Sequence, residues 1–110
     1  MAAVIVREWR ARATASRERD YIGYFRRKVL PELGAIDGFL GASLLREERS
    51  GEIELVVLTR WASMDAVRKF AGEEIEEAVV HPEAAAMFTS FDRIVRHYEV
   101  VVDTSSTPGP

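Results

Sequence analysis

The amino-acid sequence predicts an α+β domain of the ferredoxin-like class, with the element order β-α-β-β-α-β and a four-stranded antiparallel sheet. Apolar residues alternate with polar ones in four short segments, which is typical of strands. Two other segments carry apolar residues at helical spacing and lie between strands. The chain has 110 residues, which suits one domain with one core. With right-handed crossovers, this order places both helices on one face of the sheet.

The four predicted strands span residues 4–13, 39–48, 53–61 and 94–102. In the first, Ile5 and Trp9 alternate with Glu8 and Arg10, so one side is apolar. Ser50-Gly51 between the second and third strands is a suitable two-residue hairpin turn.

The first helical segment follows the hydroxyls at residues 14–16 and continues to about residue 36. Pro31 has no backbone N–H, so we expect a kink or a restart there. Ser63 can cap a second helix, which Gly72 should end. A further short helix should begin at Pro82.

Both faces of the predicted sheet are substantially apolar, although two helices can cover only one of them. Val56 and Leu58 oppose Ile53, Leu55 and Val57 in the third strand. Leu40, Ala42 and Leu44 oppose Phe39 and Leu45 in the second. Either the protein is a monomer with an exposed apolar surface, or the sheets of two copies pack on each other. We predict the homodimer.

Composition excludes several classes of function. There is no cysteine, which excludes disulfides, thiolate nucleophiles and cysteine-ligated metals. No apolar run reaches the ~20 residues of a membrane span, and the net charge of −3 gives no general attraction to nucleic acid or an anionic membrane. A cytoplasmic protein is the expectation. Residues 1–102 should form the domain, and residues 103–110, rich in Ser, Thr, Pro and Gly, a flexible tail.

The junction LTRWASMDAV (residues 58–67), with Trp61, Ser63, Asp65 and Ala66, resembles the W-x-S-x-[DE]-A junction of antibiotic biosynthesis monooxygenase (ABM) domains. The turn at Asp37-Gly38 and the closing strand around Tyr98 also resemble that family, over residues 3–102 in all. The resemblance implies ferredoxin-like homodimers whose sheets form an α/β barrel. Some members oxidise phenolic or anthrone-type substrates with O2 and no cofactor, others degrade heme, and many have no known activity.

The heme-degrading members use an Asn on the first strand, with a Trp and a His in the second helical region. This sequence contains no Asn or Gln. Its first strand offers Arg7, Glu8 and Trp9, and the stretch around Phe70 has no Trp, although His81 is present. Heme degradation therefore ranks third among the functional hypotheses.

His81 and His97 are the candidate catalytic residues, because oxygenation of a phenol or anthrone needs a base that titrates near neutral pH. His81 precedes Pro82, and its side chain either points into a cavity or lies in a solvated loop. His97 lies in a strand and faces either the cavity or the sheet–sheet interface, where its role would be structural.

The candidate substrate-binding residues are aromatic side chains and one strand arginine: Tyr24, Phe70, Trp9, Trp61 and Arg60. The aromatic residues either form a wall for a flat ligand or simply fill the core. Of the strand arginines Arg7 and Arg60, Arg60 shares its side with Val56 and Leu58 and should need an anionic partner. No spacing indicates a metal site, and no cofactor is expected.

These observations favour a cofactor-independent monooxygenase that acts on a small aromatic substrate of phenol, anthrone or quinol type. The alternative is a non-catalytic dimeric protein that binds a small aromatic or apolar ligand in a cavity. An enzyme of this kind should have a pocket of at least ~300 Å³ with a His or Tyr in its wall.

Overall fold

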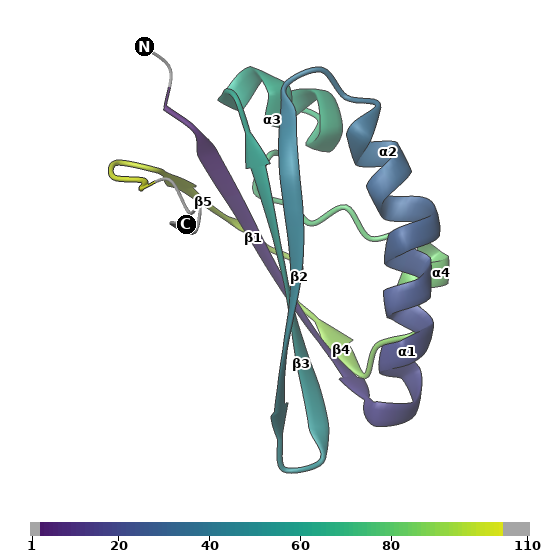
Figure 1. Cartoon of the computed structure of the whole chain (residues 1–110). Helices are drawn as coiled ribbons and strands as arrows, with labels where there is room; N and C mark the ends of the chain where they lie inside the picture. The colour runs from purple at the N-terminus through teal and green to yellow at the C-terminus, as the bar shows by residue number, and fades with distance from the viewer. Residues whose placement is uncertain (1–2, 105–110) are drawn as a thin grey trace, which may run out of the picture.

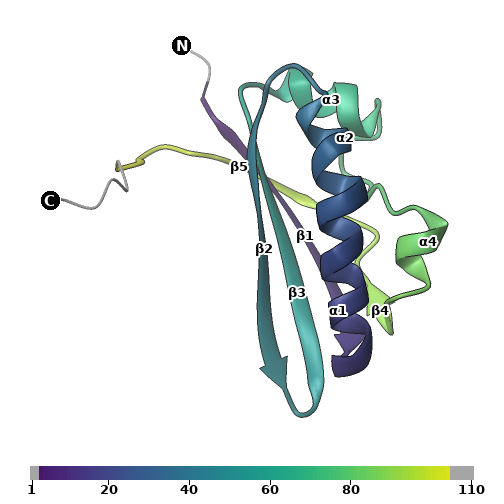
Figure 2. The same cartoon turned by 45° about the vertical axis from the view of Figure 1, so that its right-hand side comes forward.

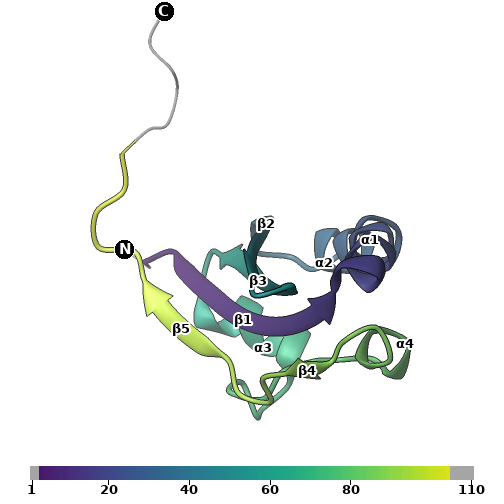
Figure 3. The same cartoon turned by 90° about the horizontal axis from the view of Figure 1, so that it is seen from below.

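The computed structural model describes residues 3–104 and confirms the predicted α+β, ferredoxin-like architecture (Figure 1). The sheet is antiparallel, and the helices lie on one side of it (Figure 3). The strands are β1 (Ile5–Thr14), β2 (Phe39–Arg49), β3 (Glu52–Trp61), β4 (Ser90–Phe91) and β5 (Arg96–Glu99). The helices are α1 (Ala15–Tyr24), η1 (Phe25–Val29), α2 (Leu30–Gly34), α3 (Met64–Ala71) and α4 (Pro82–Ala85). Residues 105–110 of the predicted tail lie outside the described residues.

The sheet has the order β2-β3-β1, and both β4 and β5 pair with the outer edge of β1. The fourth strand predicted over residues 94–102 is shorter in the structure, where β5 covers Arg96–Glu99. The sequence pattern does not predict β4, so the sheet has five strands instead of the predicted four. From Arg93 to Val95, between β4 and β5, the backbone bonds to the loop that follows α3 instead of to β1. Val95 N–H donates to the Glu76 carbonyl at 2.8 Å, and Ala78 N–H donates to the Arg93 carbonyl at 2.8 Å. The loop that follows α3 thus takes this segment away from β1 and separates β4 from β5.

The segments α1, η1 and α2 form one continuous helical rod along the sheet (Figure 2). Thr14 caps its start, since its side chain accepts a hydrogen bond from Arg17 N–H. The π-helical turn of η1 comes directly before Pro31, and there Leu30 N–H donates to the Phe25 carbonyl. Instead of restarting at Pro31, the helix widens one turn earlier and then continues.

The predicted hairpin turn, helix cap and helix end are all confirmed. Ser50 and Gly51 both have positive φ, 50° and 82°, which a two-residue hairpin turn of the primed type requires. Ser63 caps α3 by accepting from Ala66 N–H at 3.1 Å. Gly72 ends that helix with a φ of 80°, a conformation that is costly for other residues.

The core lies between the helices and one face of the sheet and has two parts. The larger part packs Tyr21, Tyr24 and Phe25 of the helical rod onto Ile53 and Leu55 of β3. The smaller part gathers Leu33, Trp61, Ala66 and Val67 where α2 meets α3. Residues of both parts, including Tyr24 and Leu33, also line a cavity.

The other face of the sheet carries no element of this chain among the described residues (Figure 3). Several of its large apolar side chains are exposed, including Leu40, Leu45, Ile94 and Tyr98. The alternation predicted for β2 is wrong, because the strand contains a β-bulge between Phe39 and Gly41. Because of the extra residue, Phe39 packs in the core with Ala42 and Leu44, whereas Leu40 and Leu45 share the open face.

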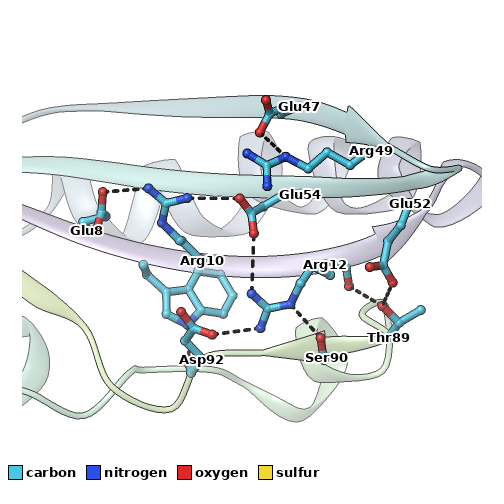
Figure 4. Close-up of polar contacts among 11 residues, drawn as sticks. Glu8, Arg10, Arg12, Glu47, Arg49, Glu52, Glu54, Thr89, Ser90 and Asp92 are labelled. Carbon is cyan, nitrogen blue, oxygen red and sulfur yellow. Dashed lines mark hydrogen bonds and ion pairs between the residues drawn. The ribbon is translucent and has the colours of Figure 1, made fainter.

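A ladder of alternating charges also crosses this open face (Figure 4). Arg10 bridges Glu8 and Glu54, at 3.3 and 3.0 Å. Arg12 bridges Glu54 and Asp92, at 3.8 and 2.8 Å. All five side chains keep part of their solvent contact, so the pairs act as a network of modest individual strength. The face therefore combines exposed apolar side chains with a network of charges that joins β1 to β3 and to Asp92.

Candidate functional site

A cavity of about 70 Å³ lies between the helical face of the sheet, the helical rod and the segment that links α3 to α4. Its wall is largely apolar, and the aromatic residues in it are Trp9, Tyr21, Tyr24 and Phe70. Its polar side chains include Arg7, Thr59 and His81. The structure thus brings His81, Tyr24, Trp9 and Phe70 together, as the sequence predicted, in a space smaller than the ~300 Å³ expected of an enzyme pocket.

His81 lies at the exposed side of the cavity, directly before α4. Its Nε2 is 3.5 Å from Oε2 of Glu32, which comes from α2. About half of each side chain is exposed, so water reaches this pair. A carboxylate beside one ring nitrogen favours the tautomer with the proton on that nitrogen, which leaves the lone pair on Nδ1. The pair can therefore accept a proton from a ligand at the cavity wall.

Arg7 lies at the buried side of the cavity and is 4 % exposed. Its Nη1 donates to the Ile75 carbonyl at 2.6 Å and to His97 Nε2 at 3.0 Å, and its Nη2 donates to the Glu77 carbonyl at 2.9 Å. Its guanidinium carbon also lies 5.6 Å from the centre of the Phe70 ring. Burial lowers the pKa of Arg7 to about 10, so the side chain stays charged at neutral pH.

His97 does not line the cavity, although it points to the same side of the sheet as Arg7, its partner in the β1–β5 register. Its Nε2 accepts the bond from Arg7 and so carries no proton. Burial first, and the Arg7 charge second, lower the pKa of His97, while Glu76 opposes the shift. His97 is thus a neutral hydrogen-bond acceptor that holds Arg7.

The cavity's two tyrosines are kept in the neutral phenol form. Burial raises the pKa of Tyr21, and Tyr24 adds to the effect. Burial also raises the pKa of Tyr24, followed by the negative charges of Glu83 and Glu32. Both residues pack face to face, with ring centres 6.0 Å apart. They supply flat walls and hydroxyl groups that can donate a hydrogen bond.

Trp61 and Arg60 do not take part in this site. Trp61 is fully buried in the smaller core cluster, where it stacks on Phe70 and donates from Nε1 to Thr59 Oγ1 at 2.8 Å. Arg60 is exposed on the open face of the sheet, beside Gly41. The reason is strand alternation: Thr59 and Trp61 face the helices, so Arg60 faces away.

Arg7 and Glu32 belong to the site but are not among the residues predicted for it from the sequence. For Arg7 a signal existed, since it shares its side of β1 with Ile5, Trp9 and Ala11, and an arginine among core-facing residues is unusual. Glu32 gave no signal, because a glutamate on the exposed side of a helix is ordinary.

The structure described for residues 3–104 indicates neither a metal site nor a membrane-spanning helix. Within that range, no group of three or more His, Cys, Asp or Glu side chains is arranged to hold a metal ion. None of the helices described there is long and apolar enough to cross a membrane.

Comparison with solved structures shows the same fold in proteins of low sequence identity. A candidate antibiotic biosynthesis monooxygenase from Bacillus cereus has a TM-score of 0.69 at 19% identity, over 96% of this chain and 100% of that one. A heme-degrading protein from Mycobacterium tuberculosis has a TM-score of 0.66 at 21% identity, over 94% and 98%. SnoaB, a cofactor-independent oxygenase from Streptomyces nogalater, has a TM-score of 0.56 at 15% identity, over 98% and 100%.

No curated protein matches the sequence. The family model for "Antibiotic biosynthesis monooxygenase" matches residues 4–81, from β1 to the candidate base His81. That range includes the junction around Trp61 and most of the cavity wall. The chain therefore belongs to the antibiotic biosynthesis monooxygenase (ABM) family.

Proposed function

We propose that this protein is a cofactor-independent monooxygenase that oxidises a small aromatic substrate of phenol, anthrone or quinol type with O2. The observation that carries the proposal is the His81–Glu32 pair in the wall of an aromatic-lined cavity. The similar fold of a cofactor-independent oxygenase supports the reaction class.

His81 is the proposed base. Its unprotonated nitrogen takes a proton from the substrate, and Glu32 stabilises the imidazolium that results. The electron-rich anion then reduces O2 directly. For an anthrone, the CH2 group becomes a carbonyl, one oxygen atom enters the product, and the other leaves as water with the two hydrogens. Atoms and electrons balance without a further reductant.

The size of the cavity sets a condition on this proposal. At about 70 Å³ the cavity is well below the ~300 Å³ of pockets that enclose drug-sized ligands. The segment from Val79 to His81 forms part of the wall, and Val79 and His81 are exposed. A polycyclic substrate would enter by displacing this segment outward, which makes ligand entry a conformational step.

The small cavity also favours a second candidate function. Four aromatic side chains already occupy much of the space between the helical rod and the sheet. A non-catalytic protein that binds a small aromatic or apolar ligand needs this wall but does not need a base. In that case His81 would contribute nothing beyond its place at the cavity's exposed side.

Oxygen uptake by metal-stripped protein with a panel of anthrones and hydroquinones distinguishes the monooxygenase from the non-catalytic binding protein. We expect His81→Ala to lose the uptake above the protein-free rate, and Glu32→Gln to lose part of it. Arg68→Ala is the control, because Arg68 is exposed on α3 and does not line the cavity. Equal uptake in the native chain and His81→Ala would remove His81 from the mechanism. Binding of these ligands without any uptake would favour the non-catalytic function.

We also propose that the functional unit is a homodimer formed by the open faces of two sheets. The exposed side chains of Leu40, Leu45, Ile94 and Tyr98 support it, because no element of the described chain covers them. The ladder between Glu8 and Asp92 offers both charge signs to a second copy. A two-fold axis can set such a self-complementary surface against itself.

A further inference from the structure

We propose that Arg7 binds an anionic oxygen of the ligand, so that the cavity selects aromatic molecules carrying a carboxylate or a phenolate. The inference deepens the proposed function and rests on the same cavity being the ligand site. It does not require that the ligand be oxidised.

Arg7 lacks a counter-charge in the part of the chain that the structure describes. Among the described residues, no carboxylate oxygen lies within 4 Å of the Arg7 guanidinium, whereas seven other arginines and lysines there form such pairs, from Arg10 to Lys69. All three acceptors around Arg7 are neutral: two carbonyls and one imidazole. Arg7 is also the buried arginine of the set. A buried, unpaired charge is unfavourable, and an anion at this place would relieve it.

The hydrogen-bond donors that remain on Arg7 also suit an anion. A guanidinium has five N–H groups, and the three hydrogen bonds of Arg7 use three of them, both on Nη1 and one on Nη2. The Nε–H and the second Nη2–H remain. Within residues 3–104 no side-chain nitrogen is both fully buried and without a partner, so Nε reaches accessible surface. Adjacent Nε and Nη2 donors form the fork that matches two oxygens of a carboxylate.

The surroundings of Arg7 hold its guanidinium in place through neutral acceptors. The loop after α3 has four glutamates, but it offers Arg7 the carbonyls of Ile75 and Glu77 while the Glu77 side chain is exposed. His97 is held neutral on the other side. The guanidinium is therefore oriented without being neutralised, which is what a site for an anion requires.

Apolar walls around the cation define the rest of the ligand. Trp9, Tyr24, Phe70 and Val57 line the same cavity, and they suit a flat ring better than a free inorganic anion. The Arg7 cation and the apolar wall together favour an aromatic molecule with one ionised oxygen. If the ligand is a phenol or an anthrone, Arg7 stabilises the oxyanion that His81 generates.

The test compares pairs of ligands that differ mainly in charge. The dissociation constants of 2-naphthoate and 2-naphthamide are measured by equilibrium dialysis for the native chain, Arg7→Gln, Arg7→Lys and Arg10→Gln. Arg10 is the matched control, because it lies on the opposite face of the same strand. We expect at least ~10-fold tighter binding of the naphthoate by the native chain and by Arg10→Gln, as a charge-assisted pair should give. The preference should fall below about 2-fold in Arg7→Gln and survive in part in Arg7→Lys, which retains the charge.

A second arm distinguishes the phenolate from the carboxylate. The absorbance of 2-naphtholate is followed against pH in the presence of each protein. The native chain should lower the pH at which 2-naphthol ionises, whereas Arg7→Gln should not. A shift without naphthoate preference assigns Arg7 to phenolates alone, and the reverse result assigns it to carboxylates alone.

Equal affinity of the native chain for both naphthalene ligands together with no naphtholate shift would overturn the proposal, as would a preference that persists in Arg7→Gln. Should Arg7→Gln fail to fold, the native comparison and Arg7→Lys still decide the question. Oxygen uptake is measured separately. Anion preference without uptake contradicts the proposed function and leaves Arg7 assigned, whereas uptake without anion preference contradicts only the assignment of Arg7.

Discussion

Arg7 on β1 donates a hydrogen bond from Nη1 to Nε2 of His97 on β5, at a distance of 3.0 Å. Arginine is always the donor in such a contact, so His97 must have its proton on Nδ1. The bond joins the buried charge of the cavity to the interrupted edge strand of the sheet. It explains why one of the two candidate bases is withdrawn from proton transfer while the other remains available.

The first prediction concerns the titration of His97. Because burial and Arg7 lower its pKa, the folded protein binds this proton less readily than the unfolded chain. Stability should therefore fall as the pH drops below the unfolded value of about 6.5, and level off below the folded pKa. Urea unfolding between about pH 8 and pH 5 should show a smaller loss in His97→Gln, and NMR titration should find the His97 pKa below 6.5. A His97 pKa at or above 6.5 would contradict the hydrogen bond from Arg7 to His97.

The second prediction concerns the stability supplied by Arg7. Arg7→Ala removes three hydrogen bonds and leaves the carbonyls of Ile75 and Glu77 without this donor. We expect a loss of ~2–4 kcal/mol in urea unfolding, with faster hydrogen exchange in the loop after α3. Arg68→Ala is the control, because its exposed pair with Asp65 should contribute less than ~1 kcal/mol. Equal losses in both variants would show that the buried network does not stabilise the fold.

The third prediction uses two glycines near the turn into β2. Gly38 has a φ of 94°, and a Cβ there would stand 2.6 Å from Cβ of Ala66. Gly38→Ala should therefore destabilise the protein by ~1–3 kcal/mol, from strain and steric overlap. Gly34→Ala adds a Cβ with nothing within 4 Å, and should be neutral or stabilising by up to ~1 kcal/mol. Thermal unfolding of both variants measures the contrast, and a destabilised Gly34→Ala would argue against the backbone explanation.

The fourth prediction tests the proposed dimer. Leu45→Lys places a charge on the exposed apolar part of the open face, where a second sheet would have to bury it. Sedimentation at micromolar concentration should show a dimer for the native chain and a shift toward monomer for the variant. Ala35→Lys is the control, since Ala35 is exposed just after α2 on the helical side. A native monomer would contradict the proposal, and a dimer unchanged by Leu45→Lys would place the interface elsewhere.

Some of the site was readable from the sequence, and the misses have identifiable causes. Tyr24, Phe70 and His81 were predicted together because helical spacing and the break before Pro82 place them on the covered side of the sheet. Trp61 was expected near the ligand, but a Trp that stacks on Phe70 is filling the smaller core cluster. Arg60 was preferred over Arg7, although the alternation of β1 already placed Arg7 among core residues. Glu32 could not be found, because its partner is His81, 49 positions away.

The sequence by itself determined the order of strands and helices, the hairpin at Ser50-Gly51, the caps at Thr14 and Ser63 and the break at Gly72. These features depend on local backbone preferences and on apolar periodicity, which act over a few neighbouring residues. Tertiary structure alone decided the separation of β4 from β5, because the loop after α3 competes with β1 for the backbone bonds of the segment between them. It also decided the bonding of Arg7 to Ile75, Glu77 and His97. Contacts between positions so far apart form only when the sheet assembles, since their partners are set by packing and not by local preference.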